Sequence, residues 1–229
     1  MMNRADTFLA SFNKIEKWLR KQLNFPNNMG VTEMLRRVKK QSDLPIREIE
    51  YDLIEFSQLR NAIVHNRIET DFIIAEPNEW AVNRILEIEN KLLHPRLVER
   101  VLKKNVKIFT AEVPLQEILY IIVEKEYSQF PVYQNKKFRG LITTRGVGMW
   151  FAKNANSSLL DLNYYTAIDI LDIDNKSDAV YFLAPTDTEY KAKELFKNNP
   201  RLEAILITEN GRNNGKLIGI VSPKDLFGE

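Results

Sequence analysis

The hydrophobic pattern of the chain changes near residue 105, and this change constrains the fold more than any other feature. Before it, apolar residues recur at the three- and four-residue spacing typical of amphipathic helices. The clearest of them are Phe8, Phe12, Ile15, Leu19, Ile49, Leu53, Phe56, Ile63, Ile85, Ile88 and Leu92. The spacing predicts helices over about 4–24, 31–41, 46–66 and 78–93. Four such helices can close a bundle around one apolar core.

After residue 105, short apolar runs typical of strands alternate with helical patterns. We expect strands at 130–133, 138–143, 180–183, 204–208 and 217–221, and helices at 114–126, 144–154, 187–198 and 223–228. The order helix, strand, strand, helix occurs twice, which indicates an internal repeat of two α/β units. The fold class predicted is therefore α+β. We place a helical bundle at 1–94, a basic helical linker at 95–105, and repeats at about 106–155 and 165–229.

Composition narrows the classes of function. The chain has no cysteine, which excludes disulfides and thiolate metal sites and agrees with a reducing, cytoplasmic compartment. Two isolated histidines make no metal constellation, and the apolar runs are too short to span a bilayer. We therefore expect a cytoplasmic protein with no metal, no membrane contact and no required cofactor. A net charge of +2 does not demand nucleic acid, although lysine and arginine cluster within the first 107 residues.

One helix end carries residues suited to metal-free RNA cleavage. Arg60, Asn61 and His65 fall near the end of the helix expected at 46–66. The His65 imidazole can take the proton of a ribose 2′-hydroxyl, Arg60 can stabilise the phosphorane, and Asn61 can position either group. Asn61 and His65 are four residues apart and so share a helical face. Alternatively, Arg60 pairs with a carboxylate such as Glu55 or Glu69, and His65 only caps the helix.

The same residues resemble a family motif. Arg60-Asn61 followed by His65 fits the Arg-x4–6-His signature of HEPN domains, in its Arg-Asn-x-x-x-His form. The resemblance implies a bundle of four or five helices in which two protomers bring their motifs to one shared cleft. Many members are ribonucleases and others have no demonstrated activity, so the resemblance leaves both an enzyme and a non-catalytic bundle open.

The last strand ends in a candidate nucleotide site. Ser222 follows the strand, Pro223 takes the first helical position, and Asp225 stands three residues after the serine. The Asp225 carboxylate can accept the hydroxyls of a ribose, while Lys224 and the helix N-terminus favour phosphate. Ser222-x-x-Asp225 is also the pattern of an ordinary capping box, and the two interpretations are compatible.

Segments 140–146 and 219–225, with the Phe130-Pro131-Val132 strand upstream, resemble the tandem CBS (cystathionine β-synthase) domains of a Bateman module over about 106–229. The resemblance implies an adenosine-containing ligand, a base stacked near Leu183 and Ala184, and frequent dimerisation. In the first repeat Thr143 keeps the hydroxyl position, but Gly146 replaces the acid. We therefore expect one competent cleft per chain, around Ser222, Lys224 and Asp225.

Two hypotheses follow from these motifs. In the first, an adenine nucleotide bound to the CBS pair controls a HEPN-like, metal-independent endoribonuclease that acts on RNA as a homodimer. In the second, the protein is a non-catalytic nucleotide-binding module whose helical part serves dimerisation or partner contact.

Overall fold

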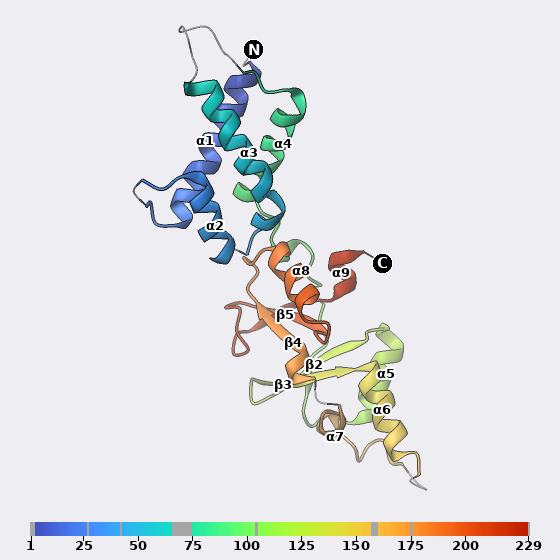
Figure 1. Ribbon diagram of the computed structural model, residues 1–229. Coiled ribbons are helices and arrows are strands. Elements are labelled where there is room, and N and C mark those ends of the chain that lie inside the picture. Colours follow the sequence, from blue (N-terminus) through green and yellow to red (C-terminus); the bar gives the residue numbers. More distant parts are fainter. Residues whose placement is uncertain are drawn as a thin grey trace. The chain divides into compact units, whose positions relative to one another are not determined.

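A computed structural model describes residues 3–26, 28–41, 43–65, 75–103, 105–156, 160–174 and 176–228. The protein is α+β, and the chain divides into two compact units, Met1–Arg96 and Leu97–Glu229. The helical unit comes first in the chain, and the strands lie in the second unit (Figure 1).

The first unit contains helices α1 (Arg4–Gln22), α2 (Val31–Gln41), α3 (Ile46–His65) and α4 (Glu79–Leu93). These bounds confirm the helices predicted from apolar spacing. Asparagine caps define two of the starts, because the Asn3 and Asn78 side chains accept hydrogen bonds from the N–H groups of Asp6 (2.7 Å) and Ala81 (2.9 Å).

One apolar core holds these helices together. Its side chains come from all four helices and include Phe8, Phe12, Leu35, Leu53, Phe56 and Ile85. Ion pairs tie the helices at the rim: Lys14 of α1 binds Glu89 of α4 at 2.7 Å, and Arg84 of α4 binds Asp52 of α3 at 2.6 Å. The described part of the chain contains no helix long and apolar enough to cross a membrane.

The second unit is built from two similar halves. The first contains β1 (Phe109–Thr110), α5 (Leu115–Lys125), β2 (Gln129–Gln134), β3 (Lys137–Thr143) and α6 (Thr144–Asn154). The second contains β4 (Val180–Leu183), α8 (Glu189–Asn198), β5 (Ala204–Thr208), β6 (Leu217–Val221) and α9 (Pro223–Phe227), and α7 (Ala167–Ile173) precedes it. The predicted strands and helices are confirmed. Among the described residues of this unit, the sequence pattern did not predict the short elements β1 and α7 or the 3-10 turn Ser177–Ala179.

The two sheets have the same topology. Their strand orders are β1-β2-β3 and β4-β5-β6. In each, the first pair is parallel and the second antiparallel, with Phe109 opposite Val132 in one sheet and Val180 opposite Ala204 in the other. The repeat inferred from the order of elements is therefore confirmed.

Each half is completed by the segment that precedes the other half. Helix α7 packs into the core of the first half through Ala167, Ile170 and Leu171. Residues 97–103, which precede the first half, pack against the second: Val98 lies in its core, and Lys103 pairs with Ile220 of β6. The two halves are thus interlocked.

The helical conformation predicted for the basic linker at 95–105 is wrong. Within the described residues of this range, helical structure is limited to one 3-10 turn, Val98–Arg100. The reason is that the backbone of this segment pairs with strand β6, at the edge of the second sheet, instead of forming helical hydrogen bonds. The Lys103 N–H donates to the Ile220 carbonyl at 2.9 Å, and the Ile220 N–H donates to the Lys103 carbonyl at 3.1 Å. The segment gains these bonds and the burial of Val98 instead of helical hydrogen bonds.

Candidate functional site

Ser222 and Asp225 form a capping box at the start of α9. The Ser222 N–H donates to Asp225 Oδ2 at 2.8 Å, and the Ser222 hydroxyl donates to the same oxygen at 2.6 Å. The capping interpretation of this motif is therefore confirmed. The capping box uses one oxygen of the Asp225 carboxylate, Oδ2, and leaves the other oxygen, Oδ1, for different partners.

Lys103 occupies that second oxygen. Its Nζ lies 2.8 Å from Asp225 Oδ1, and the side chains of Lys103 and Asp225 are 61% and 11% exposed. Burial by itself raises the pKa of Asp225, but the hydrogen bonds from Lys103 and Ser222 outweigh it and hold this pKa below its ordinary value. The carboxylate is thus ionised at neutral pH and is fixed from two directions.

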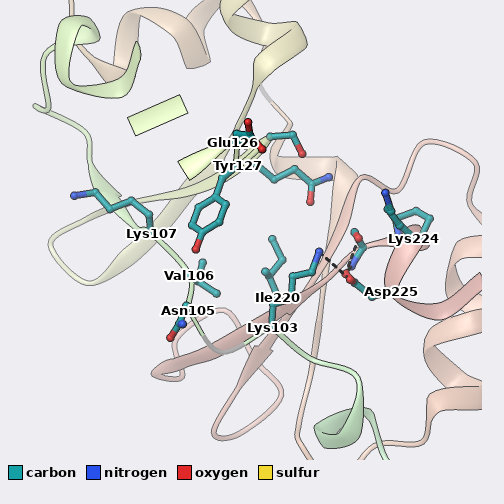
Figure 2. Close-up of a pocket in the computed structure, with 13 residues that line it drawn as sticks. Lys103, Asn105, Val106, Lys107, Glu126, Tyr127, Ile220, Lys224 and Asp225 are labelled. Carbon is teal, nitrogen blue, oxygen red and sulfur yellow. Dashed lines mark hydrogen bonds and ion pairs between the residues drawn. The ribbon is translucent and has the colours of Figure 1, made fainter. Parts of the chain in front are cut away.

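Asp225 and Lys103 stand in the wall of a cavity of about 850 Å³ within the second unit (Figure 2). This volume lies in the range of small-molecule sites. The wall is made by three stretches of chain: Lys103 with 105–107, the loop 126–129 after α5, and Ile220 with 222–225. Figure 2 shows the Lys103–Asp225 pair on one side of the cavity and Tyr127 on the other.

The wall combines three kinds of chemistry. Tyr127, Val106 and Ile220 offer aromatic and apolar surface to a flat ring. Two ammonium groups, those of Lys103 and Lys224, favour an anion such as a phosphate. The Lys107 ammonium group points away from the cavity (Figure 2) and lies 3.6 Å from Glu117 Oε1. Asp225 can accept hydroxyl groups. Because α9 is only five residues long, Lys103 and Lys224 and not a helix dipole supply the positive charge.

The residues predicted for the nucleotide site fall into two groups. Ser222, Lys224 and Asp225 line the cavity together. Leu183 and Ala184 are not part of its wall: Leu183 is buried in the core of the second half, and the Ala184 N–H donates to Asp187 Oδ2 at 2.7 Å in the turn before α8.

Lys103, residues 105–107 and the loop 126–129 carry no local motif that predicts a nucleotide site. The loop is positioned by Glu126, which ends α5 in the left-handed region at φ 54°, and by Gln129, whose Nε2 donates to the Glu203 carbonyl at 2.8 Å. The basic cluster that includes Lys103 and Lys107 was visible in the sequence, but nothing local connected it to Asp225. That connection depends on the pairing of Lys103 with Ile220, 117 residues later in the chain.

The equivalent turn of the first half has a different chemistry. The Gly146 N–H donates to the Thr143 hydroxyl at 2.9 Å, so Thr143 caps α6 without an acidic partner at position 146. A Cβ at Gly146 would lie 3.1 Å from Asp174 Oδ2, so the carboxylate of another segment fills this space. A smaller cavity of about 430 Å³ adjoins the turn and is lined by Arg145, Lys176, Asp178, Ala179, Pro200, Arg201 and Glu203.

The predicted catalytic residues lie on α3 in the first unit. Arg60 Nη1 donates to Asn61 Oδ1 at 3.3 Å, so the structure brings these two side chains together. Arg60 Nε is buried and has no hydrogen-bond partner among the described residues. His65 is the last residue of α3, and its side chain lies outside the described part of the structure, as does Glu69.

Comparison with known proteins agrees with the topology of the second unit. Residues 98–147 and 170–229 match the family model described as CBS domain, so the second unit carries a tandem CBS domain pair. No curated protein sequence matches the chain.

Solved structures that resemble this chain contain CBS domains. A CBS domain-containing protein from Kribbella flavida has a TM-score of 0.45 at 11% identity and aligns over 58% of this chain and 96% of its own. CBSX2, solved in complex with AMP, has a TM-score of 0.43 at 16% identity over 58% and 93% of the two chains. The CBS domain pair of MJ0100, solved with 5′-methylthioadenosine and S-adenosyl-L-methionine, has a TM-score of 0.43 at 16% identity over 58% and 94%.

Proposed function

We propose that the CBS pair binds an adenosine-containing nucleotide in the cavity around Asp225 and regulates the helical unit. The observation that carries this proposal is the position of the Asp225 carboxylate in the wall of a cavity that also presents an aromatic ring and the ammonium groups of Lys103 and Lys224. A ribose, a base and a phosphate each have a matching partner there. The resemblance of the sequence to CBS domains suggests that the base is adenine.

The first prediction is that Asp225→Ala weakens AMP binding at least tenfold, because it removes the hydroxyl acceptor from the cavity wall. The variant also loses a helix cap, which costs about 1 kcal/mol of stability. Isothermal titration calorimetry with AMP measures the affinity, and urea denaturation measures the cost in folding.

Asp169→Ala is the matched control for this prediction. Asp169 forms the same capping box on α7, where its Oδ2 accepts from the Thr166 N–H at 2.7 Å and from the Thr166 hydroxyl at 2.9 Å. It is not part of the cavity wall. Asp169→Ala should lose similar stability and keep wild-type affinity for AMP. Wild-type protein that binds no adenosine compound at millimolar concentration would end the nucleotide proposal.

We also propose that the first unit is a HEPN-like, metal-independent ribonuclease, with His65 as acid and base, Arg60 as charge stabiliser and Asn61 as positioning group. The observation that favours it is the Arg60 guanidinium, whose Nε is buried without a partner among the described residues while Nη1 contacts Asn61. No described carboxylate, Glu55 included, forms an ion pair with Arg60, and the other candidate partner, Glu69, lies outside the described residues.

The second prediction is that the protein cleaves single-stranded RNA in the presence of EDTA, leaves a 2′,3′-cyclic phosphate and does not cut DNA. Arg60→Ala and His65→Ala should each slow cleavage by on the order of a hundredfold or more. Arg36→Ala removes an exposed arginine from α2 and should keep full activity. Equal cleavage by wild-type and His65→Ala protein would reveal a contaminating nuclease. No cleavage with or without AMP would favour the alternative, a non-catalytic nucleotide-binding module.

A shared HEPN cleft requires two chains, and we propose that the protein is a homodimer. Exposed apolar side chains on the second unit support self-association, notably Tyr120 and Val123 on α5. In a two-fold dimer each copy contributes the same surface, and the proposed shared cleft requires that the same symmetry also bring the ends of the two α3 helices together.

A further inference from the structure

The Lys103–Asp225 ion pair takes one of the acceptor positions that the two hydroxyls of a ribose need. Asp225 Oδ2 already accepts two hydrogen bonds from Ser222. A carboxylate oxygen has two acceptor positions, so a ribose can be bound only at Oδ1. Lys103 Nζ, 2.8 Å away, takes one of the two acceptor positions of Oδ1, so a single position is left for the two hydroxyls of a ribose.

The backbone of Lys103 is fixed, but its ammonium group is not. Reciprocal N–H···O bonds with Ile220 hold the backbone at 2.9 and 3.1 Å. The side chain is 61% exposed, and the described structure pairs its Nζ with one carboxylate, that of Asp225. Rotation of the long lysine stem can therefore move the charge within the cavity while the fold stays unchanged.

From this geometry we infer that Lys103 is the specificity-determining residue of the cavity: it competes with the ribose for Asp225 Oδ1 and becomes the counter-ion of the ligand phosphate. This inference rests on the proposed nucleotide site and defines its ligand class as phosphorylated nucleosides. A nucleoside without phosphate must displace the ammonium group before both of its ribose hydroxyls can donate to Oδ1, and it offers that group no new partner. A nucleotide offers a phosphate, with which a lysine forms a strong charge-assisted hydrogen bond.

The test compares AMP and adenosine by isothermal titration calorimetry on the full chain. Lys103→Met keeps the apolar stem and removes the charge. Because an exposed ion pair contributes about 0.2–1 kcal/mol, adenosine should bind about 1.4- to fivefold more tightly to this variant. The preference for AMP over adenosine should fall about tenfold or more, because a hydrogen bond to a charged phosphate is lost. Lys103→Arg keeps the charge and should keep the preference.

Lys14→Met is the matched control. Lys14 binds Glu89 at 2.7 Å with exposures of 59% and 14%, nearly the values of the Lys103–Asp225 pair, and it belongs to the first unit. Lys14→Met removes the same charge and should change neither the affinity for AMP nor the affinity for adenosine. The same shift in both variants would assign the effect to net charge and overturn the inference.

The inference on Lys103 is also overturned if adenosine binds Lys103→Met no more tightly than it binds the wild type. It is overturned as well if the preference for AMP over adenosine survives in this variant. These outcomes differ from failure of the proposed function, in which neither AMP nor adenosine binds any variant. Urea denaturation of each variant establishes that the affinities belong to folded protein.

Discussion

Asp225 uses its two carboxylate oxygens for different purposes. Oδ2 accepts hydrogen bonds from Ser222 and so stabilises the start of α9. Oδ1 binds Lys103 in the wall of the cavity. The sequence alone predicted the first use and placed Ser222, Lys224 and Asp225 at a common site. It missed Lys103, because a lysine in a basic cluster has no local pattern that points to one particular carboxylate.

The third prediction concerns the pH dependence of stability. The pKa of Asp225 in the folded protein is below its ordinary value of 3.8, because hydrogen bonds from Lys103 and Ser222 outweigh the opposing effect of burial. Asp225 therefore stabilises the fold above pH 3.8, and this contribution is lost as the pH falls through the lower folded pKa.

Asp225→Asn removes this titration. Its free energy of unfolding, measured with urea between pH 7 and acid, should approach that of the wild type as the pH falls below about 4. A constant difference between the two proteins across this range would mean that Asp225 does not titrate differently in the folded and unfolded states.

At the scale of elements, the sequence predicted most helices and strands because their apolar positions repeat over several turns or alternate over several residues. The misses have physical reasons. Strand β1 has only two residues, too few for an alternating pattern. Helix α7 has seven residues, and its best signal is the capping box of Thr166 and Asp169 at its start. Residues 97–103 carry helix-forming residues, but their structure is decided by a distant sheet edge.

The fourth prediction tests the contact between residues 97–103 and β6. A Cβ on Gly219 would lie 2.7 Å from the Lys103 carbonyl oxygen and would also overlap Leu102. Gly219→Ala should therefore force this segment away and lower the free energy of unfolding of the second unit by about 1–3 kcal/mol. Urea denaturation measures the change.

Gly148→Ala is the comparison. Gly148 lies in helix α6, and a Cβ there meets nothing within 4 Å. The same substitution should raise stability by about 0.5–1 kcal/mol, since alanine is the better helix former. A Gly219→Ala protein as stable as the wild type would show that residues 97–103 are not held tightly against β6.

At the scale of the whole molecule, the fifth prediction is self-association. Static light scattering should give a mass of about twice the 26.8 kDa of one chain at micromolar concentration. The same measurement after dilution gives the strength of the association. A mass near that of one chain throughout would remove the basis for a cleft shared between two α3 ends, while leaving the nucleotide site of the second unit intact.

The segment that carries Lys103 also connects the two units along the chain. Lys103 is seven residues after the end of the first unit at Arg96, and its partner Asp225 lies on α9. A ligand that releases Lys103 from Asp225 thus changes a side-chain contact of the stretch of chain that leads to the helices, while the backbone bonds to Ile220 stay in place. Regulation follows only if the ligand binds one arrangement of this stretch more tightly than another.

The interlocked halves have a consequence for synthesis on the ribosome. Lys103 stays without its partner strand until Ile220 has been made, 117 residues later. At about 5–20 residues per second, this interval lasts roughly 6–23 seconds. The first unit, whose core comes entirely from α1–α4, needs no such distant partner and can fold during the wait. The newborn chain can therefore complete its helical unit before its second unit closes, so folding of the helices does not depend on the proposed nucleotide site.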